Sequence, residues 1–355
     1  MAAYTTIDDP TIYFNSVLYT GTGSSGSNRQ ITGVGFQPDW VWIKNRNSAQ
    51  EHVLVDSIRG ATKSLDSSAN SAESTTSTQV GAFISDGFQL GSGSLQNRVN
   101  GSGNGLVAWN WKAGTSFSND ASATGVGSLD SAGSINTTAG FSIIGYSGDT
   151  SDAPSTVAHG LSQKPEMMFI KRRTSTGQWV VYNKTIDATD NLHLDSDAAR
   201  HDYLYYFQDT EPTSSVFTVG DDGETNKTGD TYINYIFHSV QGYSKIGSYT
   251  GNGDADGTYV HLGFKPAFVM IKSSSNSSQS WVIQDNKRDG FNYNNHRLFA
   301  NSSNNEETTV RMDLLSNGFK CRDNDGNGNG FVYIFMAFAE SPFVTGASAI
   351  PTTAR

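Results

Sequence analysis

The sequence predicts an all-β protein made of three tandem jelly-roll-like antiparallel β-sandwich repeats behind a short N-terminal arm. Composition is the first reason, because 16% of the 355 residues are charged, 11% are aromatic, and 37 are glycines. This balance favours strands and turns over long helices. Repetition is the second reason. A Tyr-Thr/Ser-Gly opening, an apolar run between proline and lysine, an Asn/Asp-rich middle and an aromatic closing run occur three times in the same order, which indicates a repeated unit.

The apolar run is the most regular element of the three copies. It separates a proline from a lysine by six residues each time, in residues 38–44, 165–171 and 266–272. Because these runs have no polar side, we expect strands that are covered on both faces. Each copy is also long enough to bury a core of its own.

The closing runs, residues 106–111, 232–237 and 333–338, are rich in aromatic residues. They are expected to form half-buried strands that supply one face of a core.

Four tryptophans invite a carbohydrate-stacking interpretation: Trp40, Trp42, Trp109 and Trp111. The matching positions of the other two copies hold methionine, phenylalanine and tyrosine. The copies therefore share apolar bulk rather than indole, which predicts core packing for all four side chains.

The repeats also predict the domain organisation. The arm that precedes the first opening would either dock onto a partner or form an ordinary ordered terminus. A tract of Ser, Gly, Ala and Thr between the first two copies indicates a linker. The expected boundaries are 1–16 for the arm, 17–114 for repeat 1, 115–139 for the linker, 140–242 for repeat 2, 243–343 for repeat 3 and 344–355 for a C-terminal tail.

A glycan-binding patch is predicted where aromatic residues stand near planar hydrogen-bonding groups. Two tryptophans follow polar loops, and the segment after the second is dense in such groups. Core packing of the tryptophans, and a structural Asp-Arg pair like that of Asp56 and Arg59 in the first copy, are the alternatives. The candidate glycan-binding residues are Trp179, Trp281, Asp285, Arg288, Tyr293 and Asn295.

The run from Asp323 to Gly330 resembles the start of a calcium loop, but its twelfth position is Ile334 instead of glutamate,. Similar runs precede the closing strand of the other copies, so a β-turn is favoured. We expect no metal site and no cofactor.

Charge and motifs restrict the remaining function classes. The formal net charge of -10 disfavours nucleic acid and anionic membranes as partners,. Cys321 is the one cysteine, so no internal disulfide is possible,. We expect no signal peptide and no membrane insertion, since the N-terminal residues lack an apolar core segment. The usual catalytic motifs are missing and the seven histidines are scattered, so we expect no enzyme and no catalytic residues.

Phrases along nearly the whole chain are distinctive: MAAYTTIDDPTIYF, QPDWVWIKNR, DSIRGATKSL, SDGFQLG, VAWNWKAG, KPEMMFIK, QGYSKIGSYTGNGDADGTYV, GFKPAFVMIK and FMAFAESPFV. They resemble repeat-containing virion proteins of tailed bacteriophages, especially of marine hosts. Such proteins are commonly labelled tail fibre or lectin-like proteins of concanavalin or laminin-G type.

This resemblance implies a tail fibre or tail-associated adhesin that assembles in the host cytoplasm and acts on the virion tail. We expect a homotrimer whose partners are other virion proteins and host-surface polysaccharide, with the N-terminal arm docked on the virion. A head-decoration protein and a polysaccharide depolymerase are the alternatives. The depolymerase would need paired carboxylates in a groove.

Overall fold

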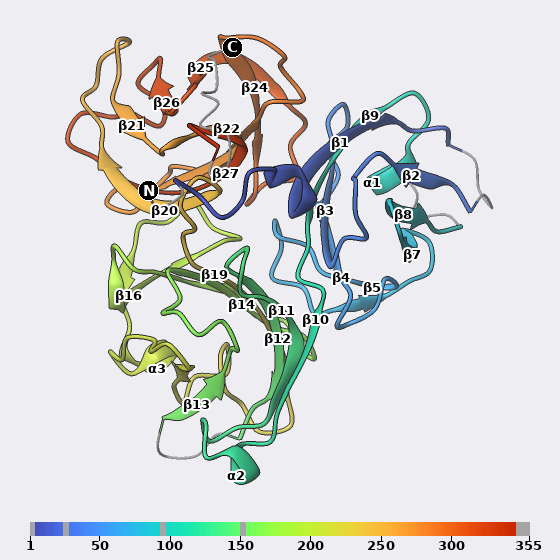
Figure 1. The fold of residues 1–355 in the computed structure, drawn as a ribbon, viewed down its shortest axis with the longest axis vertical. Coiled ribbons are helices and arrows are strands. Elements are labelled where there is room, and N and C mark those ends of the chain that lie inside the picture. The colour runs from blue at the N-terminus through green and yellow to red at the C-terminus, as the bar shows by residue number, and fades with distance from the viewer. Residues whose placement is uncertain (1–3, 24–27, 93–96, 150–153, 346–355) are drawn as a thin grey trace.

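The computed structural model describes residues 4–23, 28–92, 97–149 and 154–345. Over these residues the protein is all-β, as the sequence predicts, with several antiparallel sheets and helices of a single turn. Figure 1 shows three lobes around a common centre, which we call the first (blue to teal), second (green to yellow) and third (orange) units. Within the described part, no helix has the length and apolar character needed to cross a membrane.

Each unit contains an inner sheet with the same strand order. The closing strand lies between the opening strand and the strand that ends in lysine, and a fourth strand follows at the far side. The order is β1-β9-β3-β4, then β12-β19-β14-β15, then β20-β27-β22-β23. The bounds are β1 Phe14–Thr20, β3 Trp40–Asn45, β4 Val53–Asp56, β9 Gly105–Trp111, β12 Phe141–Ser147, β14 Met167–Arg172, β15 Trp179–Asn183, β19 Thr231–Phe237, β20 Ser244–Thr250, β22 Phe264–Ser273, β23 Val282–Asp285 and β27 Val332–Pro342.

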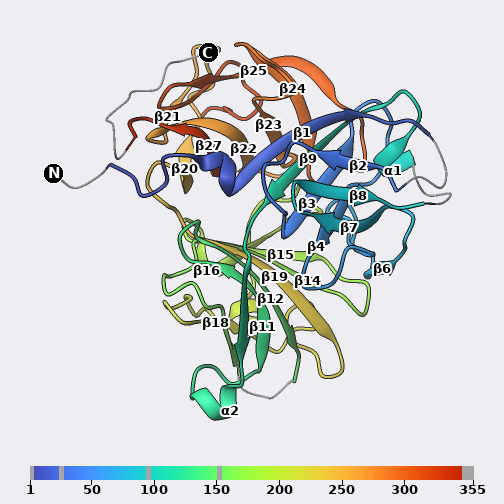
Figure 2. The same cartoon turned by 45° about the vertical axis from the view of Figure 1, so that its right-hand side comes forward.

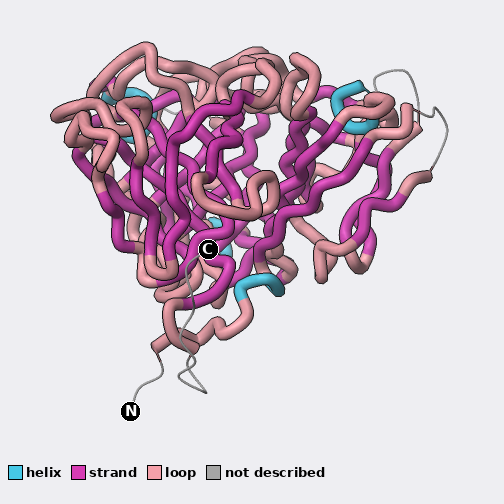
Figure 3. Tube along the Cα trace, turned by 90° about the horizontal axis from the view of Figure 1, so that it is seen from above, coloured by secondary structure: helices cyan, strands magenta, loops and turns pink. Residues whose placement is uncertain are grey.

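Shorter strands form an outer layer in each unit, and Figure 3 shows the strands filling the middle of the molecule with loops at their ends. In the third unit the outer strands continue the inner sheet through β24. The bounds are β2 Gln30–Thr32, β7 Val80–Ile84 and β8 Gly87–Leu90; β13 Ser155–Ala158 and β18 Val216–Val219; β21 Tyr259–His261, β24 Asn294–Phe299, β25 Glu307–Leu315 and β26 Gly318–Cys321. The remaining elements are β5 Lys63–Ser64, β6 Ser74–Thr75, β16 Asp187–His193, β17 His201–Asp202, α1 Asn97–Asn100 and α3 Leu204–Phe207.

An apolar cluster fills the space between the inner and outer layers of each unit. Val41, Val53 and Phe88 belong to the cluster of the first unit. Ile170 and Phe217 represent the second unit, and the third unit has its own cluster as well. Each unit therefore buries a core of its own, which is consistent with a β-sandwich.

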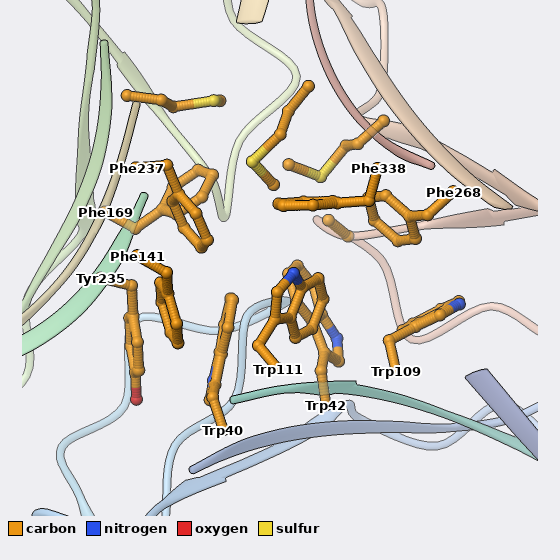
Figure 4. Packing of buried hydrophobic residues seen from close by; sticks show 14 of the residues in the cluster. Trp40, Trp42, Trp109, Trp111, Phe141, Phe169, Tyr235, Phe237, Phe268 and Phe338 are labelled. Carbon is orange, nitrogen blue, oxygen red and sulfur yellow. The ribbon is translucent and has the colours of Figure 1, made fainter. Parts of the chain in front are cut away.

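A fourth and larger cluster lies where the three inner sheets meet. Figure 4 shows its aromatic side chains converging from three ribbons. Trp40 of the first unit stacks on Tyr235 of the second, with ring centroids 4.3 Å apart. Trp111 meets Phe268 of the third unit at 5.7 Å. The predicted core packing of Trp40, Trp42, Trp109 and Trp111 is confirmed, because all four are at most 1% exposed.

This central core covers the second face of every inner sheet. In β3, for example, the side chains of Val41 and Ile43 belong to the first unit's own cluster, whereas Trp40 and Trp42 belong to the central one. The prediction of strands covered on both faces is confirmed. The sequence did not predict that the copies share one interior.

Residues 115–139 are not a free linker. They form β10 (Thr115–Asn119), the short helix α2 (Ala121–Thr124) and β11 (Ser131–Asn136), and β11 pairs with β12 of the second unit. Figures 1 and 2 place both strands along the edge of that sheet. Small residues allow β11 to lie close to β12, since a Cβ on Gly133 would be 1.9 Å from the carbonyl oxygen of Ile143.

The predicted N-terminal arm is part of the fold from residue 4 onward. The Tyr4 hydroxyl donates to the Gly263 carbonyl at 2.6 Å, and Thr5 donates to the Gln241 carbonyl at 2.7 Å. Ile7 lies in the central core. A single-turn helix, η1 (Pro10–Ile12), leads into β1, which begins inside the predicted arm. These contacts tie the arm to the third unit, to the end of the second and to the central core of the same chain. Most of the predicted tail, residues 346–355, lies outside the described residues.

Candidate functional site

The two tryptophans of the predicted glycan patch lie in the interior. Trp179 is 0% exposed and Trp281 is 1% exposed. The Trp179 indole donates to the Asp66 carbonyl of the first unit at 2.8 Å, and the Trp281 indole donates to the His193 carbonyl of the second unit at 2.9 Å. Sugar stacking is therefore wrong for both residues, and the core-packing alternative holds.

Asp285 and Arg288 are buried as well and form an ion pair, with Nε 2.6 Å from Oδ2. The Trp109 indole donates to the same carboxylate at 2.9 Å. Burial opposes ionisation of Asp285, but the charge of Arg288 and the hydrogen bonds from Arg288 and Trp109 together lower the pKa of that carboxyl group. Neither residue is available to a glycan, so the structural Asp-Arg pair is the correct alternative.

The last two predicted residues are near the surface. Tyr293 is 58% exposed, whereas Asn295 is half-buried and its backbone N–H donates to Asp289 at 2.9 Å. The six predicted residues thus do not form one patch, and Tyr293 is the one with an open aromatic ring.

Tyr293 borders a polar and aromatic surface on the outer layer of the third unit. Side chains alternate along β26 and β21, so Phe319 and Val260 point inward while their neighbours point outward,. The register pairs Lys320 with Tyr259. We call this surface the third-unit face and define it by Asp256, Tyr259, His261, Tyr293, Lys320 and Arg322.

Side-chain contacts form two groups within the third-unit face, which the strand register of Tyr259 with Lys320 places side by side. The Arg322 guanidinium lies 6.0 Å from the centre of the Tyr293 ring. Asp256 accepts an ion pair from Arg322 at 3.3 Å and from Lys320 at 2.5 Å. The hydroxyl of Tyr259 lies 3.2 Å from Nδ1 of His261. Exposed rings therefore stand beside charged donors and an acceptor that face solvent.

The electrostatics keep Asp256 and Arg322 charged at neutral pH. A hydrogen bond from Lys320 lowers the pKa of the Asp256 carboxyl. A hydrogen bond to Asp313 raises the pKa of Arg322. The third-unit face thus presents both signs of charge together with aromatic surface.

An open groove of about 760 Å³ lies between the second unit and the Ile58 turn of the first. Ser118, Ala132 and Gly145 line it with small side chains. Its carboxylates already take part in hydrogen bonds of the fold. The Asp120 side chain, for instance, caps the N-terminus of α2. The groove therefore has space for a ligand, but it presents few polar groups that could bind one.

The Asp323–Gly330 run is a turn. Asp323 pairs with Arg311, and Asp325 pairs with Arg297. Asn327 is buried and donates to Asn252 at 2.7 Å. Guanidinium groups already balance both carboxylates, and across the described residues no group of three or more His, Cys, Asp or Glu side chains is placed to hold a metal ion.

Sequence reasoning missed the role of the three lysines that end the apolar runs, Lys44, Lys171 and Lys272. All are 0% exposed, and burial lowers the pKa of each to about 8. Each ammonium group donates to a carbonyl of the neighbouring unit: Ser303 at 3.0 Å, Asn70 at 3.1 Å and Asp197 at 3.3 Å, respectively. The recurrence of lysine after an apolar run was the available signal.

The fold and its surfaces define a class: an all-β protein of three units around a shared aromatic interior. Residues 9–342 match the family described as a domain of unknown function, DUF7483, and the chain belongs to this family. No curated protein and no solved structure matches the chain.

Proposed function

We propose that the protein is a bacteriophage virion component, a tail fibre or tail-associated adhesin, that contacts host-surface glycan through the third-unit face. The phage assignment draws on the sequence resemblance. The glycan assignment draws on one observation: Tyr259 and Tyr293 expose 43% and 58% of their surface beside solvent-facing charged groups.

The chemistry of the third-unit face suits sugars. An aromatic ring packs against the apolar face of a sugar ring, and carboxylate and guanidinium groups hydrogen-bond to its hydroxyls. Asp256 and Arg322 provide both kinds of group, and Arg322 lies beside the Tyr293 ring. Because the acidic and basic groups pair with one another, the face favours neutral glycans over strongly charged ones.

We also propose that the three units are copies of one jelly-roll-like sandwich. A hydrogen bond from the tyrosine of each opening supports this. Its hydroxyl donates to a backbone carbonyl just before the closing strand: Tyr19 to Val99 at 2.8 Å, Tyr146 to Thr225 at 2.7 Å and Tyr249 to Gly326 at 2.6 Å. Such a matched long-range contact is expected of duplicated units.

The test is retention of the purified protein on host cells and on a glycan array. A Tyr259→Ala/Tyr293→Ala variant should lose about fivefold or more in affinity, since each exposed aromatic contact contributes about 0.5–1.5 kcal/mol. Ile12→Ser, which changes an exposed apolar residue of the first unit (44% exposed), is the matched control and should bind normally. Retention without cleavage fits the adhesin. Cleavage of the glycan would favour the depolymerase, and no retention at all would leave the decoration protein.

Placement on the particle is tested separately by labelling the protein in intact virions, where we expect signal at the tail. The expected homotrimer of whole chains is tested by mass measurement in solution. Because the three units of one chain already surround a common core, a monomeric mass would remove the trimer without affecting the glycan proposal.

A further inference from the structure

A second group of aromatic side chains lies on the outer edge of the second unit. We call it the His/Tyr cluster and define it by His193, His201, Tyr203, Tyr205 and Tyr206. The rings of His193 and His201 are 5.4 Å apart, and those of His201 and Tyr203 are 5.8 Å apart. Tyr203 also contacts Tyr206 at 4.6 Å and Tyr205 at 5.5 Å. The five rings form one continuous group.

Three elements hold this cluster together. His193 ends β16, and β17 carries His201 opposite Asn191. Residues one position apart from this pair, Asp190 and Asp202, lie on the other side of the strands,. Tyr203 is the N-cap residue of the short helix α3, and the helix supplies Tyr205 and Tyr206, with Tyr206 anchored in the second unit's core.

Part of the cluster is open to solvent. Tyr205 is 48% exposed and the adjacent Leu204 is 41% exposed. His201 is also exposed, whereas Tyr206 is buried beneath. Burial lowers the pKa of His193 to about 4, so its ring is uncharged at neutral pH. The solvent-facing part of the cluster is therefore an aromatic platform that includes the rings of Tyr205 and His201.

Carboxylates border this platform. The Tyr203 hydroxyl donates to Asp222 at 2.8 Å, and Gln208 donates to Asp221 at 3.3 Å. The hydrogen bond to Asp222 raises the pKa of Tyr203 to about 12. The platform thus differs from the third-unit face, where lysine and arginine stand beside the rings.

We propose that the His/Tyr cluster is a second carbohydrate site, selective for sugars that carry a free amine. An ammonium group is attracted both to the faces of tyrosine rings and to carboxylates. The same carboxylates repel uronic acids and sulfated sugars. The inference rests on the proposed adhesin function for its biological meaning, but the two sites are separate and can be tested apart.

The experiment measures binding of the full chain to three probes: a glucosamine oligosaccharide, its N-acetylated counterpart and a uronic acid oligosaccharide. Glucosamine should bind at least about tenfold more tightly than the acetylated probe, because a charge-assisted hydrogen bond is lost on acetylation. Asp222→Asn should remove this preference, and Tyr205→Ala should weaken binding of glucosamine about threefold to tenfold.

Tyr205→Ala guards against a folding artefact, because its side chain is half exposed, while Asp222 also accepts the backbone N–H of Glu224 at 2.7 Å. Equal affinity for the uronic acid probe, or unchanged affinity in both variants, would overturn the inference. Loss of all sugar binding in Tyr259→Ala/Tyr293→Ala would do so too. Amine-selective binding without retention on host cells would instead count against the adhesin function and leave this site standing.

Discussion

The three junctions between units are packed in two different ways, two with a buried ion pair and one with apolar side chains. Where the first unit meets the second, Asp56 and Arg59 form a buried ion pair at 2.5 Å, and Asp56 accepts a hydrogen bond from the Tyr235 hydroxyl at 2.6 Å. Where the third unit meets the first, Asp285 and Arg288 do the same with Trp109. We call these the two ionic junctions.

The junction between the second and third units lacks such a pair at the corresponding positions, which lie in the described part of the chain. The matching positions hold Asn183 and Ile186, and the residue in register with Tyr235 and Trp109 is Met336. Ile186 and Met336 both belong to the central core. A buried ion pair and an apolar contact thus occupy equivalent places. We infer that both members of the pair can be replaced together with little loss of stability, whereas replacing one member alone is strongly destabilising.

Breaking one ionic junction should have the largest effect. Arg59→Met leaves Asp56 buried without its cation, and we expect a loss of about 3–5 kcal/mol in the free energy of unfolding. Urea unfolding measures it. Arg173→Met is the control, because its side chain is partly exposed where it pairs with Glu73, and should cost less than about 1 kcal/mol. Equal losses in both variants would contradict the comparison.

The buried lysines are common to all three junctions and should matter equally in each. Lys171→Met removes the donor to the carbonyls of Asn70 and Gly177. We expect a loss of about 1–3 kcal/mol in the free energy of unfolding. Lys44→Met and Lys272→Met should fall in the same range in parallel urea titrations. A large loss at one junction alone would show that the lysines are not equivalent.

Acid should weaken one junction selectively. His52 occupies the position of Trp179 and Trp281 and lies 2.9 Å from the Phe299 carbonyl. Burial lowers its pKa to about 3, against about 6.5 when unfolded. The unfolded chain therefore binds the proton first, and stability present above pH 6.5 is lost as the pH falls towards 3, by up to about 1.4 kcal/mol per pH unit.

Denaturant unfolding at several pH values tests this, with His52→Gln as the comparison. His159 and His193 also have pKa values lowered by burial, to about 4, so the variant should retain part of the slope. An unchanged slope between pH 6.5 and 4 would rule out the assigned role of His52.

Converting an ionic junction into the apolar type should have the smallest effect. Asp56→Asn combined with Arg59→Ile copies Asn183 and Ile186 into the first unit. We expect a free energy of unfolding within about 1 kcal/mol of the original, because both members of the pair leave together. If the double variant is as unstable as Arg59→Met, the two kinds of junction are not interchangeable.

The sequence was sufficient for the all-β class and for local burial. The apolar runs ending at Lys44, Lys171 and Lys272 form strands covered on both faces, and Trp40 packs in a core, because periodicity and bulk are local properties. It was not sufficient to show that side chains of the other units cover the second face of each inner sheet. That arrangement depends on contacts between residues far apart, such as Trp40 with Tyr235.

The candidate site was less predictable for the same reason. Trp179 and Trp281 follow polar loops, yet their indoles donate to carbonyls of another unit. Residues 115–139 have the composition of a linker, yet Gly133 is required for close strand approach. The composition of a segment shows which environments are compatible with it. Whether the segment is exposed depends on which distant residues the fold places beside it.

The place of β27 in the chain has a consequence for synthesis. This strand is the last of the inner strands to be made, and it contributes Ile334, Met336 and Phe338 to the central core. While a ribosome is still translating the third unit, the indole rings of the first two units lack the third-unit side chains that cover them in the folded protein. Domains generally fold as units in the order of synthesis, but here the apolar faces of the first two inner sheets stay partly uncovered until the strands of the third unit have been made.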